Sequence, residues 1–185
     1  MKSSSLITTI SKCVVLGVIC TCFASCTSNQ NNEINTQIDS ALESKQINFM
    51  LDSFNRAAAK ADFNSYFNFY TSDAIFTGTD ATERWDKKAF MEWAKPIFDK
   101  GRAWNFTALE RHIYFDATGN LAWFDELLNT PMKICRGSGV LVKQGSLWKV
   151  KQYILSTTVP NELLDTVIKI KTPVEDSLIQ KLIKE

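Results

Sequence analysis

The sequence predicts an α+β domain, in which N-terminal helices pack on a curved antiparallel β-sheet and a helical tail follows. Three observations support this prediction. Apolar residues recur at helical spacing in the first part of the chain. Aromatic and β-branched segments separated by turn signals follow them, and helical periodicity returns after residue 161. A run of helices followed by a run of strands is typical of the α+β class.

The N-terminal residues 1–25 have the features of a secretory signal peptide. They contain Lys2 and Lys12 but no acidic residue. An apolar run over residues 13–24 follows, and it is too short to cross a bilayer as a permanent helix. We therefore expect this segment to be removed from the mature protein.

Residues 23–26, FASC, resemble the lipobox of bacterial lipoproteins, in which the signal peptide is cut before the cysteine and the cysteine is acylated. We expect Cys26 to carry the lipid, which would attach the protein stably to a membrane. Residues 26–36 are polar and lack aromatic side chains, so they predict a flexible tether. Thr27 stands where aspartate marks inner-membrane retention in well-studied bacteria. The expected location is the cell envelope, with the outer membrane favoured and the domain facing the periplasm or the cell surface.

Charge and cysteine content exclude several classes of function. Removal of the signal peptide leaves 19 basic against 20 acidic residues, without the basic stripe that nucleic acid requires. Cys135 is the remaining thiol, so no internal disulfide is expected, and a small buried hydrophobe is the favoured interpretation. With His112 as the single histidine, we expect no metal site. No phosphate-binding loop is present either, so no cofactor is expected.

Helical periodicity predicts three helices before most of the sheet. Apolar residues at helical spacing cover residues 38–61, and a shorter aromatic segment covers residues 62–70. The segment SDAIFTGTD, residues 72–80, predicts a short strand that leads into a loop. A third helix is expected from residue 86 to about residue 100, where a Lys-Gly pair ends the pattern.

The second part of the chain predicts a meander of four antiparallel strands. They cover residues 103–116, 121–130, 132–143 and 147–158. The tail, residues 162–185, predicts two helical pieces, because Thr172-Pro173 has the features of a new helix start. We expect its apolar stripe to pack on its own domain, with a partner protein as the alternative.

Four motifs resemble, in order, the SnoaL-like branch of the nuclear transport factor two and ketosteroid isomerase superfamily. They are GTDATERW at 78–85, NLAWFDE at 120–126, RGSGVLVK at 136–143 and WKVKQYILSTTVPN at 148–161. The resemblance implies that residues 37–161 form a cone, whose helices cover the concave face of the sheet and leave an apolar cavity at the wide end. It also implies a homodimer through the outer face of the sheet. Known members include isomerases, cyclases, dehydratases and non-catalytic scaffolds, so the fold alone does not fix the chemistry.

The loop TGTDATERW, residues 77–85, has two interpretations. Asp80 and Glu83 have the spacing of a capping box, which would make the loop a helix start. The apolar stripe of the third helix, however, fits a start at Asp86. The loop then corresponds to the cavity rim of the family, and we favour this interpretation.

Candidate ligand-binding residues come from strand alternation, the aromatic load and the resemblance. Alternation in the last strand places Trp148 and Gln152 on one face, which is the expected interior. The resemblance suggests that Arg136 also faces inward, as part of an ion pair or as an anchor for an anionic or carbonyl-bearing ligand. Trp85 and Trp123 complete the set, because the aromatic load would suit a flat apolar ligand.

Candidate proton carriers are the carboxylates near the expected cavity. They are Asp80, Glu83, Asp125 and Glu126. Asp125 and Glu126 are neighbours on one strand, so only one of them can face the cavity, and the sequence does not choose between them. A carboxyl group buried among aromatic residues would have a raised pKa and could act as a general base. A solvated or ion-paired carboxylate is the alternative. In relatives, histidines often stand near Gln152, and their replacement here argues against acid–base chemistry.

These observations give one leading hypothesis and two alternatives. The leading hypothesis is a membrane-anchored lipoprotein whose domain binds a small, largely apolar molecule. The first alternative is an enzyme of the isomerase, cyclase or dehydratase type that uses a cavity carboxylate. The second is a non-catalytic interaction module of an envelope complex.

Overall fold

Three helices precede most of the sheet in the computed structural model, which describes residues 39–184. They are α1 (Ser40–Ala59), α2 (Phe63–Asn68) and α3 (Lys87–Phe98). Each begins after an aspartate whose side chain accepts a backbone N–H group of the first turn. These aspartates are Asp39, Asp62 and Asp86. The three predicted helices and the start at Asp86 are confirmed. The predicted signal peptide, Cys26 and the tether lie outside the described residues.

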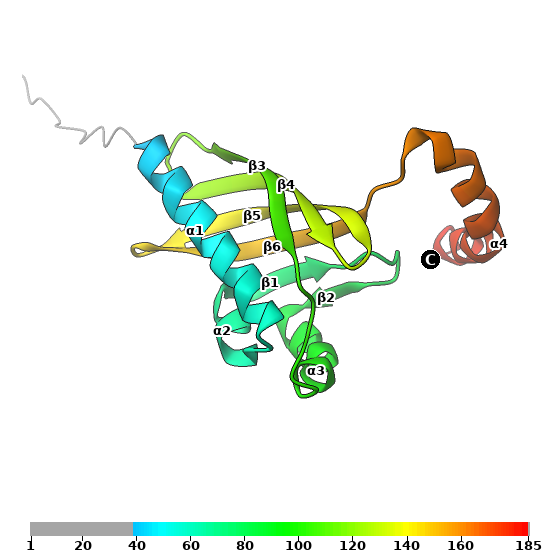
Figure 1. Cartoon of the computed structure of the whole chain (residues 1–185), viewed down its shortest axis with the longest axis horizontal. Helices are drawn as coiled ribbons and strands as arrows, with labels where there is room; N and C mark the ends of the chain where they lie inside the picture. Colours follow the sequence, from blue (N-terminus) through cyan, green and yellow to red (C-terminus); the bar gives the residue numbers. More distant parts are fainter. Residues whose placement is uncertain (1–38, 185) are drawn as a thin grey trace, which may run out of the picture. The chain divides into compact units, whose positions relative to one another are not determined.

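The helices lie against one six-stranded sheet (Figure 1). Its strands are β1 (Tyr70–Thr77), β2 (Arg84–Asp86), β3 (Thr107–Phe115), β4 (Leu121–Thr130), β5 (Lys133–Gln144) and β6 (Leu147–Thr157). Their order across the sheet is β2-β1-β6-β5-β4-β3. Figure 1 shows α1 lying across the strands, while α2 and α3 gather near β1 and β2. The α+β class and the four-stranded meander are confirmed.

Two features of the sheet differ from the prediction. The first strand, β1, pairs in parallel with the last strand, β6, so the sheet is mixed and not wholly antiparallel. The long chain between these strands permits parallel pairing, which a short turn cannot provide. The short strand β2 was not predicted, because it covers only three residues. It pairs with β1 and brings the loop between them against the domain.

A β-bulge in β6 changes which of its side chains face the core. Leu141 and Val140 are neighbours on β5. Their partners on β6, Val150 and Gln152, are two residues apart. Lys151 is therefore an extra residue, and the side-chain alternation changes phase there. The buried residues of β6 are Trp148, Val150, Tyr153 and Leu155.

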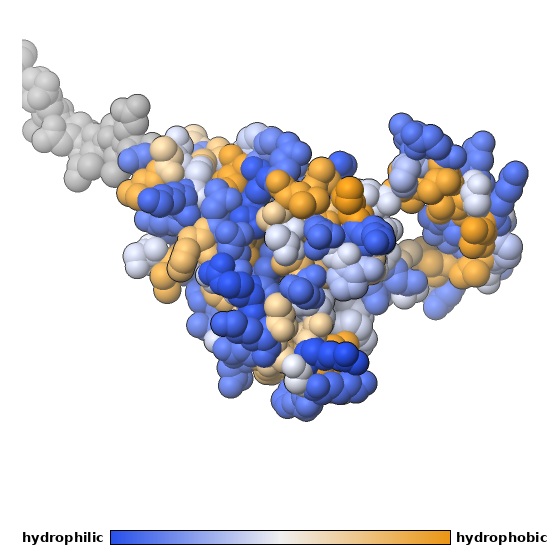
Figure 2. All heavy atoms as spheres, in the orientation of Figure 1, coloured by the Kyte–Doolittle hydropathy of each residue, from blue (hydrophilic) through white to orange (hydrophobic). Residues whose placement is uncertain are grey.

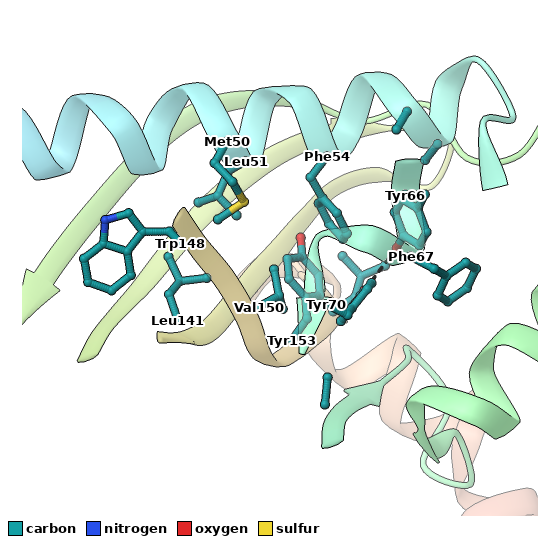
Figure 3. Close-up of a cluster of buried hydrophobic side chains, with 14 of the residues drawn as sticks. Met50, Leu51, Phe54, Tyr66, Phe67, Tyr70, Leu141, Trp148, Val150 and Tyr153 are labelled. Atoms are coloured by element: carbon teal, nitrogen blue, oxygen red, sulfur yellow. Dashed lines mark hydrogen bonds between the residues drawn. The ribbon is translucent and has the colours of Figure 1, made fainter. Parts of the chain in front are cut away.

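An aromatic core fills the space between the helices and the inner face of the sheet (Figure 3). Phe54 of α1 faces Tyr153 of β6, with ring centroids 5.6 Å apart. The same Phe54 ring stacks on Tyr66 of α2 at 4.5 Å. Cys135 is fully buried in this core, which confirms its prediction as a small buried hydrophobe. Much of the aromatic load therefore joins the helices to the sheet.

The tail forms one continuous helix, α4 (Leu164–Leu182), after a 3₁₀ turn at Asn161–Leu163. The predicted new start at Thr172-Pro173 is wrong. The Thr172 hydroxyl donates to the Ile168 carbonyl within the helix, and Pro173 removes only one backbone donor. None of the α4 residues is buried, so the expected packing of its apolar stripe on the domain is wrong as well. Figure 2 shows apolar side chains at its surface.

No helix among residues 39–184 is long and apolar enough to cross a membrane.

Candidate ligand-binding cavity

A cavity of about 270 Å³ lies between the helices and the inner face of the sheet. Eight of its fourteen lining residues are aromatic. They are Phe54, Tyr66, Phe76, Phe90, Trp93, Trp104, Phe106 and Tyr153. An apolar cavity of about 150 Å³ is large enough to hold benzene. This cavity therefore has room for roughly one or two rings.

Several cavity rings lie nearly parallel to one another. Phe76 of β1 stacks on Phe90 of α3, with centroids 4.0 Å apart and 6° between the ring planes. The ring centroids of Phe90 and Trp104 are 6.0 Å apart, with 18° between the ring planes. Those of Trp104 and Trp93 are 6.4 Å apart, with 30° between the planes. Parallel faces of this kind suit offset stacking with another flat ring.

The β1–β2 loop forms one wall of the cavity through Gly78, Thr79 and Glu83. The Gly78 N–H donates to the Glu83 carbonyl at 2.9 Å and closes the loop. Inside it, Asp80 Oδ1 accepts the Thr82 N–H at 2.8 Å, and Glu83 Oε2 accepts the Asp80 N–H at 3.2 Å. A Cβ atom at Gly78 would lie 2.1 Å from Glu83 Oε2, so the glycine leaves room for this carboxylate. The loop is a cavity wall and not a helix start, as we favoured from the sequence.

A second carboxylate, Glu126 of β4, belongs to a buried polar cluster. Arg111 Nε of β3 donates to Glu126 Oε2 at 2.8 Å. Arg111 Nη2 lies 2.7 Å from the same oxygen, without a hydrogen-bonding angle. The Tyr153 hydroxyl donates to Glu126 Oε1 at 3.0 Å. Arg111 Nη1 reaches α1, where it donates to Asn48 Oδ1 at 2.9 Å and to Asp52 Oδ1 at 3.1 Å.

The structure decides which of the two neighbouring carboxylates on β4 faces inward. Glu126 is 2% exposed, whereas Asp125 lies on the outer face, opposite His112. Burial raises the pKa of Glu126, although Arg111 and Tyr153 oppose that effect. Glu126 is not among the residues that line the cavity, whereas Tyr153, which donates to it, is. Through Arg111 and Tyr153, Glu126 therefore joins β3, β4, β6 and α1.

Gly137 of β5 is required by this cluster. A Cβ atom at this position would lie 2.5 Å from the Tyr153 hydroxyl and 3.0 Å from Glu126 Oε1. Both distances are shorter than ordinary packing allows, so any larger residue would push the two groups apart. Gly137 and the buried Cys135 therefore occupy inward positions of β5.

A family model for the SnoaL-like domain matches residues 47–160. That span covers more than half of the chain and contains every residue that lines the cavity. The chain belongs to the SnoaL-like domain family.

Solved structures share the fold of this SnoaL-like domain at low sequence identity. An NTF2-like protein of unknown function from Pseudomonas putida KT2440 is 15% identical and has a TM-score of 0.57, with 66% of this chain and 92% of that chain covered. A proposed dehydratase of the NTF2-like family from Streptomyces avermitilis is 12% identical, with a TM-score of 0.55 over 65% of this chain and 99% of that chain. A proposed scytalone dehydratase from Novosphingobium aromaticivorans is 14% identical, with a TM-score of 0.54 over 64% of this chain and 86% of that chain. These likenesses show the fold alone. A search of the curated proteins finds no match.

Two of the predicted ligand-binding residues face away from the cavity. Arg136 is exposed on the outer face of the SnoaL-like domain, because Cys135 and Gly137 take the inward positions beside it. Gln152 lies on the outer face, opposite Val140, because the bulge at Lys151 reverses the alternation. The predicted inward placement of both residues is wrong.

The three predicted tryptophans lie elsewhere in the domain and do not line the cavity. Trp123 is 44% exposed on the outer face, where it stacks on Tyr114. Trp148 is buried as predicted, but its Nε1 donates to a Glu43 carboxylate oxygen at 2.7 Å. Trp85 lies behind the cavity wall and stacks on the lining residue Trp93 at 4.9 Å.

Sequence reasoning missed the inner arginine and the inner tyrosine. Arg111 alternates with Ile113 and Phe115, two residues packed against the core, and this pattern could have identified it. Tyr153 had no comparable local signal, because a bulge precedes it. Among residues 39–184, no group of three or more His, Cys, Asp or Glu side chains is placed to hold a metal ion.

Proposed function

We propose that the SnoaL-like domain binds a small, flat, largely apolar molecule in its aromatic cavity. The observation that carries this proposal is the lining, which combines eight aromatic residues with a few polar groups on one wall. Concave, mostly apolar cavities with a few placed polar groups are typical of small-molecule sites. The volume of about 270 Å³ favours a ligand of roughly one or two rings.

Calorimetric titration with naphthalen-2-ylmethanol tests the proposal. Trp104 lines the cavity, so Trp104→Ala should weaken binding about tenfold, the equivalent of roughly 1.4 kcal/mol. Trp123→Ala is the matched control, because Trp123 lies on the outer face, and it should leave the affinity unchanged. Equal losses in the two variants, or no saturable binding by the wild-type protein, would overturn the proposal.

An enzyme of the isomerase, cyclase or dehydratase type is the second candidate, and one observation favours a specific residue for it. Of the four carboxylates considered from the sequence, Glu83 lines the cavity. It would be the proton carrier, because Glu126 is engaged by Arg111 and Tyr153. Loss of turnover in Glu83→Gln with unchanged ligand affinity would support catalysis. Unchanged turnover would exclude Glu83 from that role.

We also propose that a lipid on Cys26 holds the domain at the cell envelope, with the outer membrane favoured. The FASC motif at residues 23–26 and the polar segment that follows support this location. Mass spectrometry of the protein purified from membranes should show an acylated N-terminal cysteine. A Cys26→Ser variant that stays in the membrane fraction would argue against lipid attachment.

A further inference from the structure

We infer that the cavity selects flat aromatic ligands that carry an ammonium group over the same ligands carrying a carboxylate. This inference rests on the proposed function, because it assigns the chemical class of ligand to the same cavity. Three features of the described residues lead to it: the charge of the lining, the hydrogen-bonding roles of its polar groups, and the faces of its aromatic rings.

Glu83 is the one charged side chain among the fourteen lining residues, which include no lysine, arginine or histidine. Its Oε2 accepts the backbone N–H of Asp80. Within residues 39–184, no ion pair joins it to a basic side chain. The cavity wall therefore presents a negative charge whose counterion could be supplied by the ligand.

The hydroxyl of the lining residue Tyr153 is not available to an anionic ligand. The proton of the Tyr153 hydroxyl is donated to Glu126, so Tyr153 has no proton left for a ligand carboxylate. The hydroxyls of Tyr66 and Tyr70 lie 3.1 Å apart and share a hydrogen bond, which uses one of their two protons. The bond from Tyr153 to Glu126 therefore favours a ligand that brings its own donors at this position.

The aromatic faces of the cavity favour a cationic ligand, as the Glu83 carboxylate does. Trp93 and Trp104 both line the cavity, and the indole face attracts cations more strongly than other aromatic side chains do. A carboxylate beside several aromatic faces is a favourable setting for an ammonium group.

Neither of two arginines that could anchor an anion is available to the cavity. Arg136 was expected to face inward, but it lies on the outer face. Arg111 does face inward, but Glu126 and Asp52 already engage its guanidinium group. An anionic ligand would therefore enter the cavity without a cation to meet it, while repelled by Glu83.

Three probes of the same ring system test this inference by calorimetry on the full chain at neutral pH. They are naphthalen-2-ylmethylammonium, naphthalen-2-ylmethanol and 2-naphthoate. We expect the ammonium to bind at least about tenfold more tightly than the carboxylate, with the alcohol between them. Glu83→Gln should weaken binding of the ammonium about tenfold and leave binding of the alcohol within about twofold.

Glu92→Gln provides the matched control, because it removes the same charge from the neighbourhood of Trp93. The Glu92 side chain is 70% exposed and lies 4.0 Å from Lys88, and Glu92 is not a lining residue. Glu92→Gln should change none of the three affinities. Equal affinities for the three probes, or equal losses of ammonium affinity in both variants, would overturn the inference while the proposed function stands. Failure of all three probes to bind would overturn the proposed function, and the inference with it.

Discussion

Glu126 and Glu83 are carboxylates of one domain in opposite surroundings. Glu126 is 2% exposed, and Arg111, Tyr153 and the groups behind them engage both of its oxygens. Glu83 lines an open cavity, where a backbone N–H group is its one hydrogen-bond donor among the described residues. The first charge is balanced within the protein and holds strands and a helix together. The second is left available, and this difference in partners separates a structural carboxylate from a candidate binding residue.

Removal of Arg111 from the buried polar cluster around Glu126 should have the largest effect on stability. Arg111→Met leaves the Glu126 carboxylate buried without a counterion, so the free energy of unfolding should fall by about 3–5 kcal/mol. Urea denaturation would measure the loss. Arg136→Met is the control, because Arg136 is exposed, and it should change stability by less than about 0.5 kcal/mol. A loss below about 1 kcal/mol in Arg111→Met would show that the cluster does not depend on this pairing.

Titration of Glu126 should make stability depend on pH with a defined sign. Burial raises the pKa of Glu126 in the folded protein above its ordinary value of 4.5. The folded state then holds the proton more tightly than the unfolded state does. The contribution of Glu126 to the free energy of unfolding is fully present below pH 4.5. It is lost as pH rises through the raised pKa, by up to about 1.4 kcal/mol per pH unit.

The difference in unfolding free energy between wild type and Glu126→Gln isolates this effect. The variant keeps the shape of the side chain but cannot titrate. We expect the wild-type advantage to shrink as pH rises from below 4.5 toward neutrality. An advantage that grows over this range would mean that the attraction of Arg111 outweighs burial at Glu126.

Glu83→Gln should have the smallest effect on stability. Glu83 makes no ion pair within residues 39–184, and an amide oxygen can still accept the Asp80 N–H. The free energy of unfolding should therefore stay within about 0.5 kcal/mol of wild type, as measured by urea denaturation. A loss above about 1 kcal/mol would place Glu83 with Glu126 among the structural carboxylates.

Local patterns were sufficient to predict the elements of the fold. The helices around Phe54 and Phe90 and the four-stranded meander follow from spacing within short segments, and each is confirmed. The parallel pairing of β1 with β6 depends on residues far apart in the chain, so no local pattern indicates it. The tail shows the opposite error, because a local cap signal at Thr172-Pro173 predicted a break in a helix that continues.

The candidate site was predicted only in part, for a geometric reason. The loop containing Glu83 was placed correctly, because the start of the next helix at Asp86 could be recognised from its own periodicity. Gln152 was placed on the wrong face because the bulge at Lys151 changes the phase of β6, and Arg136 because its inward placement came from the resemblance and not from a pattern in the strand. A change of one residue in phase moves every side chain to the opposite face.

The extra residue Lys151 has a practical consequence for protein engineering. Residues of β6 cannot be assigned to a face by one continuous alternation, because the segments before and after Lys151 differ in phase. Deleting Lys151 would leave a regular strand, because Val150 and Gln152 would become neighbours and already pair with the neighbours Leu141 and Val140. The loss of a single codon would then remove the bulge while Tyr153 keeps its place in the cavity wall and its bond to Glu126.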